Sequence, residues 1–144
     1  MISTDVYLHF DGRCEEAFRF YRAAFGGEFI TMQRYKDLPG GDKMSEAGRE
    51  GIMHIALQIT PATTLMGSDL PSAGDANFRV GSNFHICLQA ENEKEANKLF
   101  QLLVKDGKIE MPMNKAFWGA YFGMVEDKFG VHWMINYTST NSNQ

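Results

Sequence analysis

The hydrophobic pattern of the chain falls into two similar halves. Each half begins with a short apolar run typical of a strand, Val6–Phe10 in the first and Phe84–Ala90 in the second. In the stretch that follows, apolar residues recur at spacings of 0, 3, 4, 7 and 8, which places them on one face of a helix. These residues are Ala17, Phe20, Tyr21, Ala24 and Phe25 in the first half and Ala96, Leu99, Phe100, Leu103 and Val104 in the second. Each lies 79 residues after its counterpart, so the halves are predicted to be copies of one unit.

Both predicted helices have start and stop signals. Asp11 can cap the first helix, which is predicted to begin near Arg13. Asn92, followed three residues later by Glu95, is close to a capping box for the second helix. Glycine tolerates the left-handed conformation that ends helices, so Gly26-Gly27 and Asp106-Gly107 are predicted to end the two helices.

Three further strands are predicted after each helix. In the first half they are Glu28–Tyr35, Ile52–Thr60 and Thr63–Gly67. In the second half they are Lys108–Met113 and the two arms of a hairpin, Phe117–Val125 and Val131–Tyr137, with Asp127 fixing the turn through its own backbone. Aromatic residues dominate protein cores, so each aromatic residue of the hairpin is predicted to be core when taken alone: Phe117, Trp118, Tyr121, Phe122 and Trp133.

The resulting order, βαβββ twice, predicts an α+β fold. The chain is predicted to be a single domain of residues 1–144, with modules at about 4–69 and about 83–137 and a flexible tail at 138–144. Lys36–Gly51 contains four glycines and a proline among many charges, so it is predicted to be a mobile loop without fixed structure unless a ligand or partner orders it.

Composition narrows the possible partners and location. The net charge is −4 and the lysines and arginines are scattered, so the sequence shows no basic cluster that would bind nucleic acid or an anionic membrane. No apolar stretch is long enough to span a membrane, and the N-terminus lacks the features of a signal peptide. Cys14 and Cys87 form no CxxC pair and have no metal-binding spacing, so a cytoplasmic protein is predicted.

Few polar residues stand out as candidates for chemistry. His54 and His85 lie in predicted strands; a single strand histidine is usually structural, but the two would suit proton transfer or ligand binding if both faced a cleft. His9 and His132 are predicted at the surface, and Glu110 can face either a cleft or solvent. The sequence contains no GxGxxG opening a helix after a strand, no GxxxxGK[ST], no GxSxG and no HExxH.

Four strings resemble the PhnB-like branch of the vicinal oxygen chelate superfamily, which comprises glyoxalases, bleomycin resistance proteins and extradiol dioxygenases. They are YLHFDGRCEEAFRFYRAAFGGE (7–28), LMGSDLP (65–71), DGKIEMP (106–112) and FWGAYFGMVEDKFGVHWMIN (117–136). The resemblance implies a glyoxalase-like fold, in which two modules form a curved mixed sheet around a cleft with the helices outside. It also implies a homodimer whose second subunit often completes the cleft.

In metal-dependent members of this superfamily the ligands come from the first, fourth, fifth and eighth strands. Here the first-strand position falls near Val6 or Tyr7, and the fourth-strand position falls among residues 65–67. The fifth-strand position falls at Asn83 or His85. The eighth-strand position falls near Met134, which has His132 and Asn136 on either side. Only His85 is a convincing ligand where three or four are needed. No cofactor is therefore predicted, and a divalent metal is kept as an alternative.

Three functional hypotheses follow, and whether the protein is an enzyme stays open. The first is a metal-free protein that binds a small molecule in an aromatic, methionine-rich cleft. The second is a metal-dependent lyase, isomerase or dioxygenase with a displaced site around His54 and His85. The third is a dimeric module with a vestigial cleft. The predicted cleft residues are Tyr7, His54, His85, Trp118, Tyr121, Phe122 and Met134.

Overall fold

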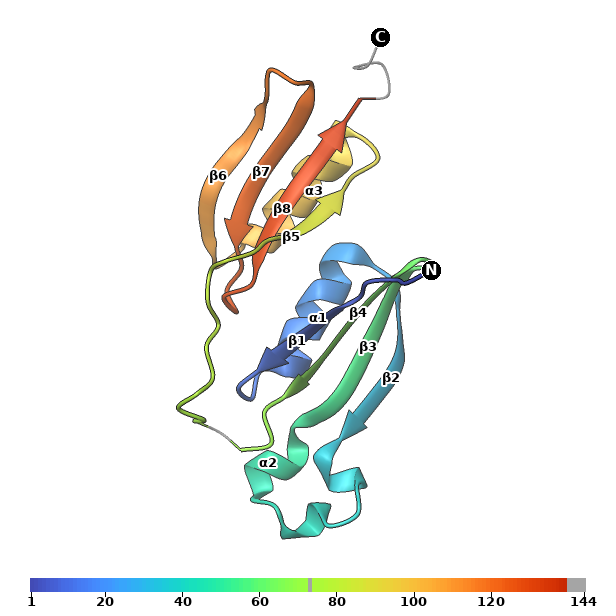
Figure 1. Cartoon of the computed structure of the whole chain (residues 1–144), viewed down its shortest axis with the longest axis vertical. Coiled ribbons are helices and arrows are strands. Elements are labelled where there is room, and N and C mark those ends of the chain that lie inside the picture. The colour runs from blue at the N-terminus through green and yellow to red at the C-terminus, as the bar shows by residue number, and fades with distance from the viewer. Residues whose placement is uncertain (73, 140–144) are drawn as a thin grey trace. The chain divides into compact units, whose positions relative to one another are not determined.

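The chain consists of two units, Met1–Phe78 and Arg79–Gln144, which we call the first and second modules. The computed structural model of the chain describes residues 1–72 and 74–139. Each module has a four-stranded sheet with one long helix packed against it (Figure 1). No helix in the described parts of the chain is long and apolar enough to cross a membrane.

The two modules repeat one topology. The first has sheet order β1-β4-β3-β2, and the second has the matching order β5-β8-β7-β6. In each sheet the first strand pairs in parallel with the fourth, and the remaining pairs are antiparallel. The elements of the first module are β1 Val6–Phe10, α1 Cys14–Phe25, β2 Glu28–Arg34, β3 Ile52–Thr60 and β4 Thr63–Asp69, and those of the second are β5 Ile86–Gln89, α3 Glu93–Val104, β6 Lys108–Lys115, β7 Ala120–Glu126 and β8 His132–Thr138. The predicted α+β fold of two βαβββ modules is confirmed.

Helix α3 buries the face that the sequence predicted. Helix α1 is rotated about its axis, so the residues it buries differ from those predicted. In α3 the buried residues are Ala96, Phe100 and Leu103, all within the predicted stripe. In α1 the buried residues are Cys14, Ala17, Phe18 and Tyr21, so Phe18 takes the central place that the pattern gave to Phe20. Gly67 on β4 makes this possible, because a Cβ there would lie 2.7 Å from the Phe18 ring.

Asp11 does not cap α1, contrary to prediction. Its carboxylate accepts a hydrogen bond from the Gly74 amide instead. The first amide of the helix, at Cys14, donates to Asp69 Oδ1 over 2.9 Å, so the capping carboxylate comes from the end of β4. The predicted cap of α3 is confirmed, since Asn92 Oδ1 accepts from the Glu95 amide over 2.8 Å.

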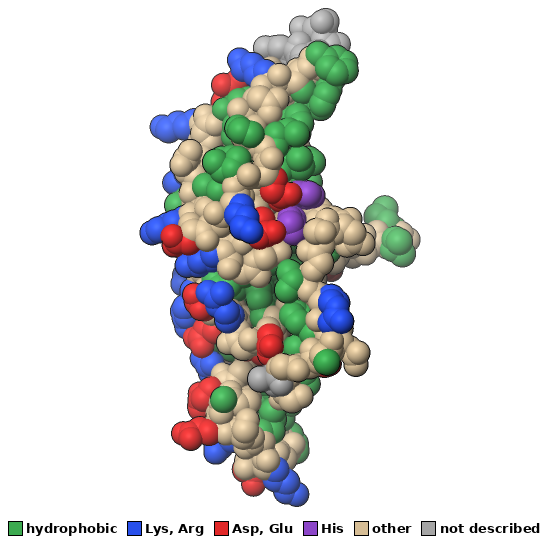
Figure 2. Space-filling view, turned by 90° about the vertical axis from the view of Figure 1, so that its left-hand side faces the viewer, with side chains coloured by type: hydrophobic (Ala, Val, Ile, Leu, Met, Phe, Trp, Pro, Cys, Tyr) green, Lys and Arg blue, Asp and Glu red, His purple; other side chains and the backbone are tan. Residues whose placement is uncertain are grey.

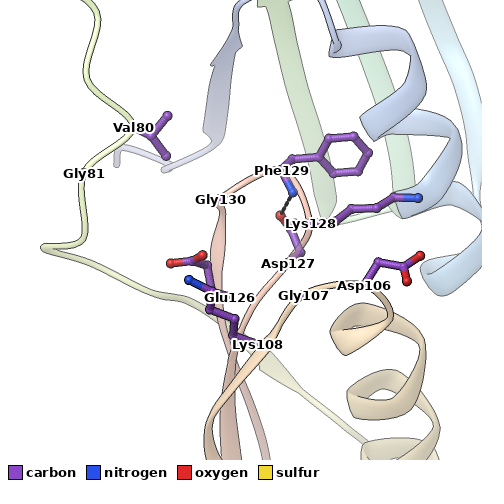
Figure 3. A pocket seen from close by; sticks show the side chains of 10 residues that line it. All are labelled: Val80, Gly81, Asp106, Gly107, Lys108, Glu126, Asp127, Lys128, Phe129 and Gly130. Atoms are coloured by element: carbon purple, nitrogen blue, oxygen red, sulfur yellow. Dashed lines mark hydrogen bonds between the residues drawn. The ribbon is translucent and has the colours of Figure 1, made fainter.

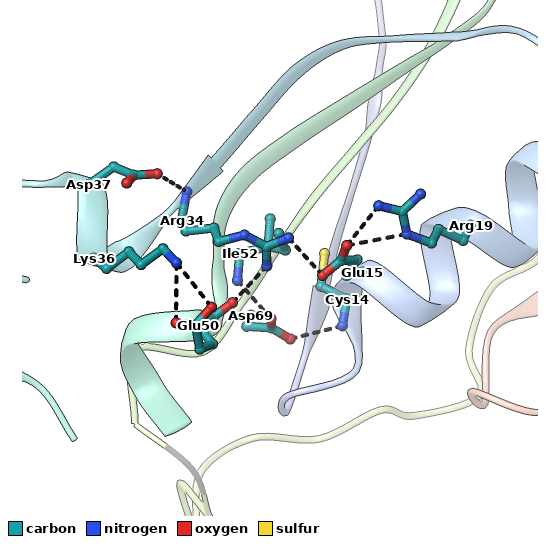
Figure 4. Close-up of polar contacts among 9 residues, drawn as sticks. All are labelled: Cys14, Glu15, Arg19, Arg34, Lys36, Asp37, Glu50, Ile52 and Asp69. Atoms are coloured by element: carbon teal, nitrogen blue, oxygen red, sulfur yellow. Dashed lines mark hydrogen bonds and ion pairs between the residues drawn. The ribbon is translucent and has the colours of Figure 1, made fainter. Parts of the chain in front are cut away.

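Lys36–Gly51 has defined secondary structure, so the prediction of a loop without fixed structure is wrong. It contains two short 3-10 helices, η1 Tyr35–Asp37 and η2 Gly41–Lys43, and the helix α2 Glu46–Glu50. Ser45 caps α2. The Arg34 guanidinium donates to the Glu50 carbonyl over 2.9 Å, and Lys36 pairs with the Glu50 carboxylate (Figure 4). These contacts fix a segment whose composition is that of a loop.

The segment Phe117–Gly119 is a turn between β6 and β7, not the start of a strand. The Ala116 amide donates to the Ala120 carbonyl across this turn, and Gly119 has a φ of +98°, which favours glycine. Phe117 is 98% exposed and Trp118 is also exposed, so the prediction that they belong to the core is wrong. Trp133 is fully buried, as predicted.

Candidate functional site

The strongest concentration of candidate groups lies on the face of the second sheet opposite α3. Gly123 faces α3, because a Cβ there would meet the Phe100 ring at 2.9 Å, and Val125 and Trp133 are buried on the same side. Successive side chains alternate between the faces of a strand. The other face therefore carries Phe122, Met124 and Glu126 from β7, His132, Met134 and Asn136 from β8, and Cys87 and Gln89 from β5. We call it the open face of the second module.

Two histidines and a glutamate meet at one end of the open face. His85 Nε2 lies 3.2 Å from Glu110 Oε1, and His132 Nδ1 lies 2.9 Å from the same oxygen. One ligand atom from each of the three residues lies within 4.8 Å of the others. Figure 2 shows histidine side chains against acidic ones at the surface. We call His85, Glu110 and His132 the histidine–glutamate cluster.

The strand pairing explains how the cluster forms. In the parallel pair of β5 and β8, Ile86 lies opposite Trp133, so the preceding residues, His85 and His132, are neighbours. Glu110 lies on β6 at a register shift between Ile109 and Met111, where it has no partner on β7. Such a bulge redirects a side chain, and here the glutamate reaches both imidazoles.

The cluster favours an ionised Glu110. Partial burial raises the pKa of this carboxyl, but the hydrogen bond from His132 and the positive charge of His132 and His85 lower it further, so the net pKa lies below the ordinary value. A second carboxylate is close by, since Glu126 Oε1 lies 3.5 Å from His132 Nε2. His132 thus lies between two acidic groups, and its side chain is only 10% exposed.

The rest of the open face is apolar in the middle and amide-lined at the far end. Met124 and Met134 are paired, and both are half-buried. Beyond them Asn136 Nδ2 donates to Gln89 Oε1 over 2.8 Å. The exposed Trp118 ring lies 5.7 Å from the Phe122 ring. Of the predicted cleft residues, Trp118, Phe122, Met134 and His85 therefore belong to this region.

The remaining predicted residues lie elsewhere. Tyr121 is on the α3 side, where its hydroxyl donates to Asn97 Oδ1 over 2.6 Å, so it does not share the open face with Phe122. Tyr7 and His54 belong to the first module: the Tyr7 hydroxyl lies 3.3 Å from His54 Nδ1, and the two rings are stacked 5.7 Å apart. His54 is not a member of the histidine–glutamate cluster.

Each module has an open cavity whose lining includes residues that make structural contacts. The cavity of the second module, about 550 Å³, has ten lining residues that include Lys108, Glu126 and Asp127 (Figure 3). Asp127 serves the turn, because its carboxylate accepts hydrogen bonds from the amides of Phe129 and Val131, as the sequence predicted. The cavity of the first module, also about 550 Å³, is lined by charged groups that pair with one another, among them Arg34 with Glu15.

The two thiols are expected to differ sharply in reactivity. Burial raises the pKa of the Cys14 thiol, and the nearby Asp69 and Glu15 raise it further. Cys87 is exposed, although desolvation raises its pKa as well. With a chromogenic disulfide reagent, one thiol per native chain should react, and Cys14 should react at least about 100-fold more slowly because it needs the helix to open. Cys87→Ser should remove the fast phase; two fast thiols in the native protein would contradict the burial of Cys14.

Sequence reasoning identified His85 but missed its partners. His132 was predicted to lie at the surface, and Glu110 was predicted to face either a cleft or solvent. The position of His132 at the start of the eighth strand, parallel to the fifth, was an available signal. The bulge that turns Glu110 toward both histidines had no sequence signal.

Comparison with known proteins identifies the family. The sequence model of the Glyoxalase/Bleomycin resistance protein/Dioxygenase superfamily matches residues 4–135. The chain belongs to this superfamily. Protein YjdN of Escherichia coli K12 is 33% identical to it over 138 residues, covering 90% of this chain and 91% of YjdN.

Solved structures agree on the fold and the branch. Protein PA1353 of Pseudomonas aeruginosa has a TM-score of 0.79 at 32% identity, covering 96% of this chain and 98% of that one. The PhnB protein of Bacillus cereus has a TM-score of 0.77 at 26% identity, covering 95% of this chain and all of that one. With YjdN, these relatives place the chain in the PhnB-like branch. Membership of the superfamily establishes no specific activity.

The residues of this chain do not fit the superfamily's usual metal ligands. On the first and fourth strands the positions are held by Val6 or Tyr7 and by Leu65, Met66 and Gly67, which include neither an imidazole nor a carboxylate. A set shared by the first, fourth, fifth and eighth strands therefore lacks at least half of its members.

Proposed function

We propose that this protein binds a small amphipathic molecule on the open face of the second module. The observation that carries the proposal is the row of half-buried apolar side chains, Phe122, Met124 and Met134, between two polar ends. Methionine adapts its shape to irregular partners, and aromatic rings offer flat contact area. Such a surface suits a ligand with an apolar or aromatic body and polar groups at its ends.

The dimensions of the face suit a small molecule. From His132 to Asn136 the strand advances four residues, or about 13 Å, at about 3.3 Å per residue. The amide groups of Asn136 and Gln89 offer hydrogen bonds at one end, and the histidine–glutamate cluster offers them at the other. The superfamily is named in part for a bleomycin resistance protein, and the resemblance to the resistance proteins implies binding of a ligand without chemistry.

A ligand screen with variants tests the proposal. The metal-stripped full chain is titrated with a panel of planar aromatic amphipaths while tryptophan fluorescence and melting temperature are followed. Trp118 lies beside Phe122 and should be quenched by a bound ring, whereas Trp133 is buried. Phe122→Ala and Met134→Ala should each weaken binding about tenfold, because each removes roughly 1.4 kcal/mol of apolar contact.

Ile30→Ala, an exposed position of the first module, is the matched control and should leave binding unchanged. A panel without a saturable binder would overturn the proposal. So would a binder that is indifferent to both open-face substitutions.

The second candidate is a metal-dependent enzyme of the superfamily, and the histidine–glutamate cluster is the observation that favours it. This candidate differs from the site predicted around His54 and His85, because the donors that gather with His85 are Glu110 and His132. The homodimer and the cytoplasmic location stay predictions; sedimentation velocity of the full chain would test the first.

A further inference from the structure

We infer that His85, Glu110 and His132 form a binding site for one divalent transition-metal ion, built entirely within the second module. The inference goes beyond the proposed ligand binding and does not depend on it. It also differs from the superfamily's usual ligand set, because the carboxylate comes from the sixth strand and no ligand comes from the first module.

Two of the three donor spacings match those around a metal ion, and all three ligand atoms lie within 4.8 Å of one another. With metal–ligand bonds of about 2.0–2.1 Å, neighbouring donors lie about 2.9 Å apart in an octahedral shell and about 3.4 Å apart in a tetrahedral one. The two imidazole nitrogens lie 2.9 Å and 3.2 Å from Glu110 Oε1. Small side-chain movements would therefore suffice for all three donors to share one ion.

His132 also has the support that metal-bound histidines have. A ligating imidazole usually presents its other nitrogen to a carboxylate, which orients the ring and raises its basicity. Here Nδ1 faces Glu110, and Nε2 lies 3.5 Å from Glu126 Oε1. The Glu126 carboxylate is thus placed to hold His132 as a ligand without coordinating the ion itself.

The charge of the cluster favours a dication. The carboxylates of Glu110 and Glu126 both lie beside His132, and acidic groups attract a divalent cation. A hydrogen-bonded network without metal can satisfy the same distances, so the experiment must distinguish this network from a metal site.

The donor types select the class of ion. Two imidazoles and one carboxylate suit Zn²⁺, Co²⁺, Ni²⁺ or Fe²⁺ better than Mg²⁺ or Ca²⁺, which prefer oxygen ligands. Three protein ligands also leave coordination positions for solvent or for oxygen atoms of a bound molecule. The ion would lie at the polar end of the open face, beside Met124 and Met134.

Cobalt binding tests the site directly. The full chain is stripped with a chelator and titrated with CoCl₂, then with ZnCl₂, by calorimetry and by the visible absorption of Co²⁺. We expect one ion per chain, with Zn²⁺ displacing Co²⁺. Glu110→Gln and His132→Gln should each weaken binding at least tenfold, and Glu126→Gln should weaken it less.

His9→Gln is the matched control, because it removes an exposed histidine of the first module and should leave binding unchanged. Melting curves of the metal-free variants check that each still folds. No saturable binding, or binding that survives both Glu110→Gln and His132→Gln, would overturn the inference and leave a hydrogen-bonded network. Since the ligand screen uses metal-stripped protein, failure of the metal site and failure of the proposed function are separate results.

Discussion

Replacing Asp127 with alanine should destabilise the second module by about 3 kcal/mol or more, because three donors lose their acceptor at once. Asp127 is 2% exposed. Its Oδ1 accepts from the amides of Phe129 and Val131 over 2.8 and 3.0 Å, and its Oδ2 accepts from the buried Trp133 indole over 2.8 Å. The substitution therefore loosens the β7–β8 turn and the largest core side chain together.

Guanidinium unfolding of the full chain, followed by Trp133 fluorescence, measures this loss. Asp127→Asn is the graded variant: its carbonyl oxygen can still accept from the turn amides, but its amino group cannot accept from Trp133, so about half of the effect should remain. Lys98→Ala, at an exposed position of α3, should change stability by less than about 0.5 kcal/mol. A loss below about 1 kcal/mol for Asp127→Ala would show that water replaces the carboxylate.

Replacing Asp69 with alanine should have a comparable effect on the first module, again about 3 kcal/mol. Asp69 is 5% exposed, and its two carboxylate oxygens accept from the amides of Cys14 and Ile52, each over 2.9 Å (Figure 4). One bond fixes the start of α1, where a negative charge also favours the helix dipole. The other fixes the start of β3, so one side chain ties together three elements of the sequence.

Urea unfolding followed by circular dichroism measures this loss of stability, because the substitution removes the cap of helix α1. Asp69→Asn keeps one acceptor and should cost less than alanine. Asp42→Ala, an exposed aspartate of the same module, should be nearly neutral. If the alanine and asparagine variants at Asp69 were both as stable as the wild type, the carboxylate would not be the capping group of α1.

Local contacts explain why the fold could be predicted from the sequence. The apolar stripes, the Asn92 cap and the glycines at the helix ends act within a few residues of one another, so both long helices and most strands were predicted. The duplication then supplied the topology, because two copies of one pattern imply two copies of one sheet. Strand Ile52–Thr60 was predicted with its observed bounds.

Long-range packing explains the errors. Phe18 replaced Phe20 in the core because Gly67, far along the chain, leaves space for its ring. Asp69, not the nearby Asp11, satisfies the first amide of α1. Lys36–Gly51 is held by contacts with the end of β2, among them that of Arg34 with the Glu50 carbonyl, which composition does not reveal.

The sequence by itself determined the two βαβββ modules, because periodicity and local signals encode them, and four of its strings carry the resemblance to the superfamily. It predicted His85 within a strand, whereas β5 begins one residue later, at Ile86. Only the tertiary structure decided which side chains meet. The parallel register of β5 and β8 places His132 beside His85, and a bulge in β6 turns Glu110 toward both. Strand register and bulges depend on pairing between distant segments, and that pairing is what assembles a candidate metal site from residues that look unrelated along the chain.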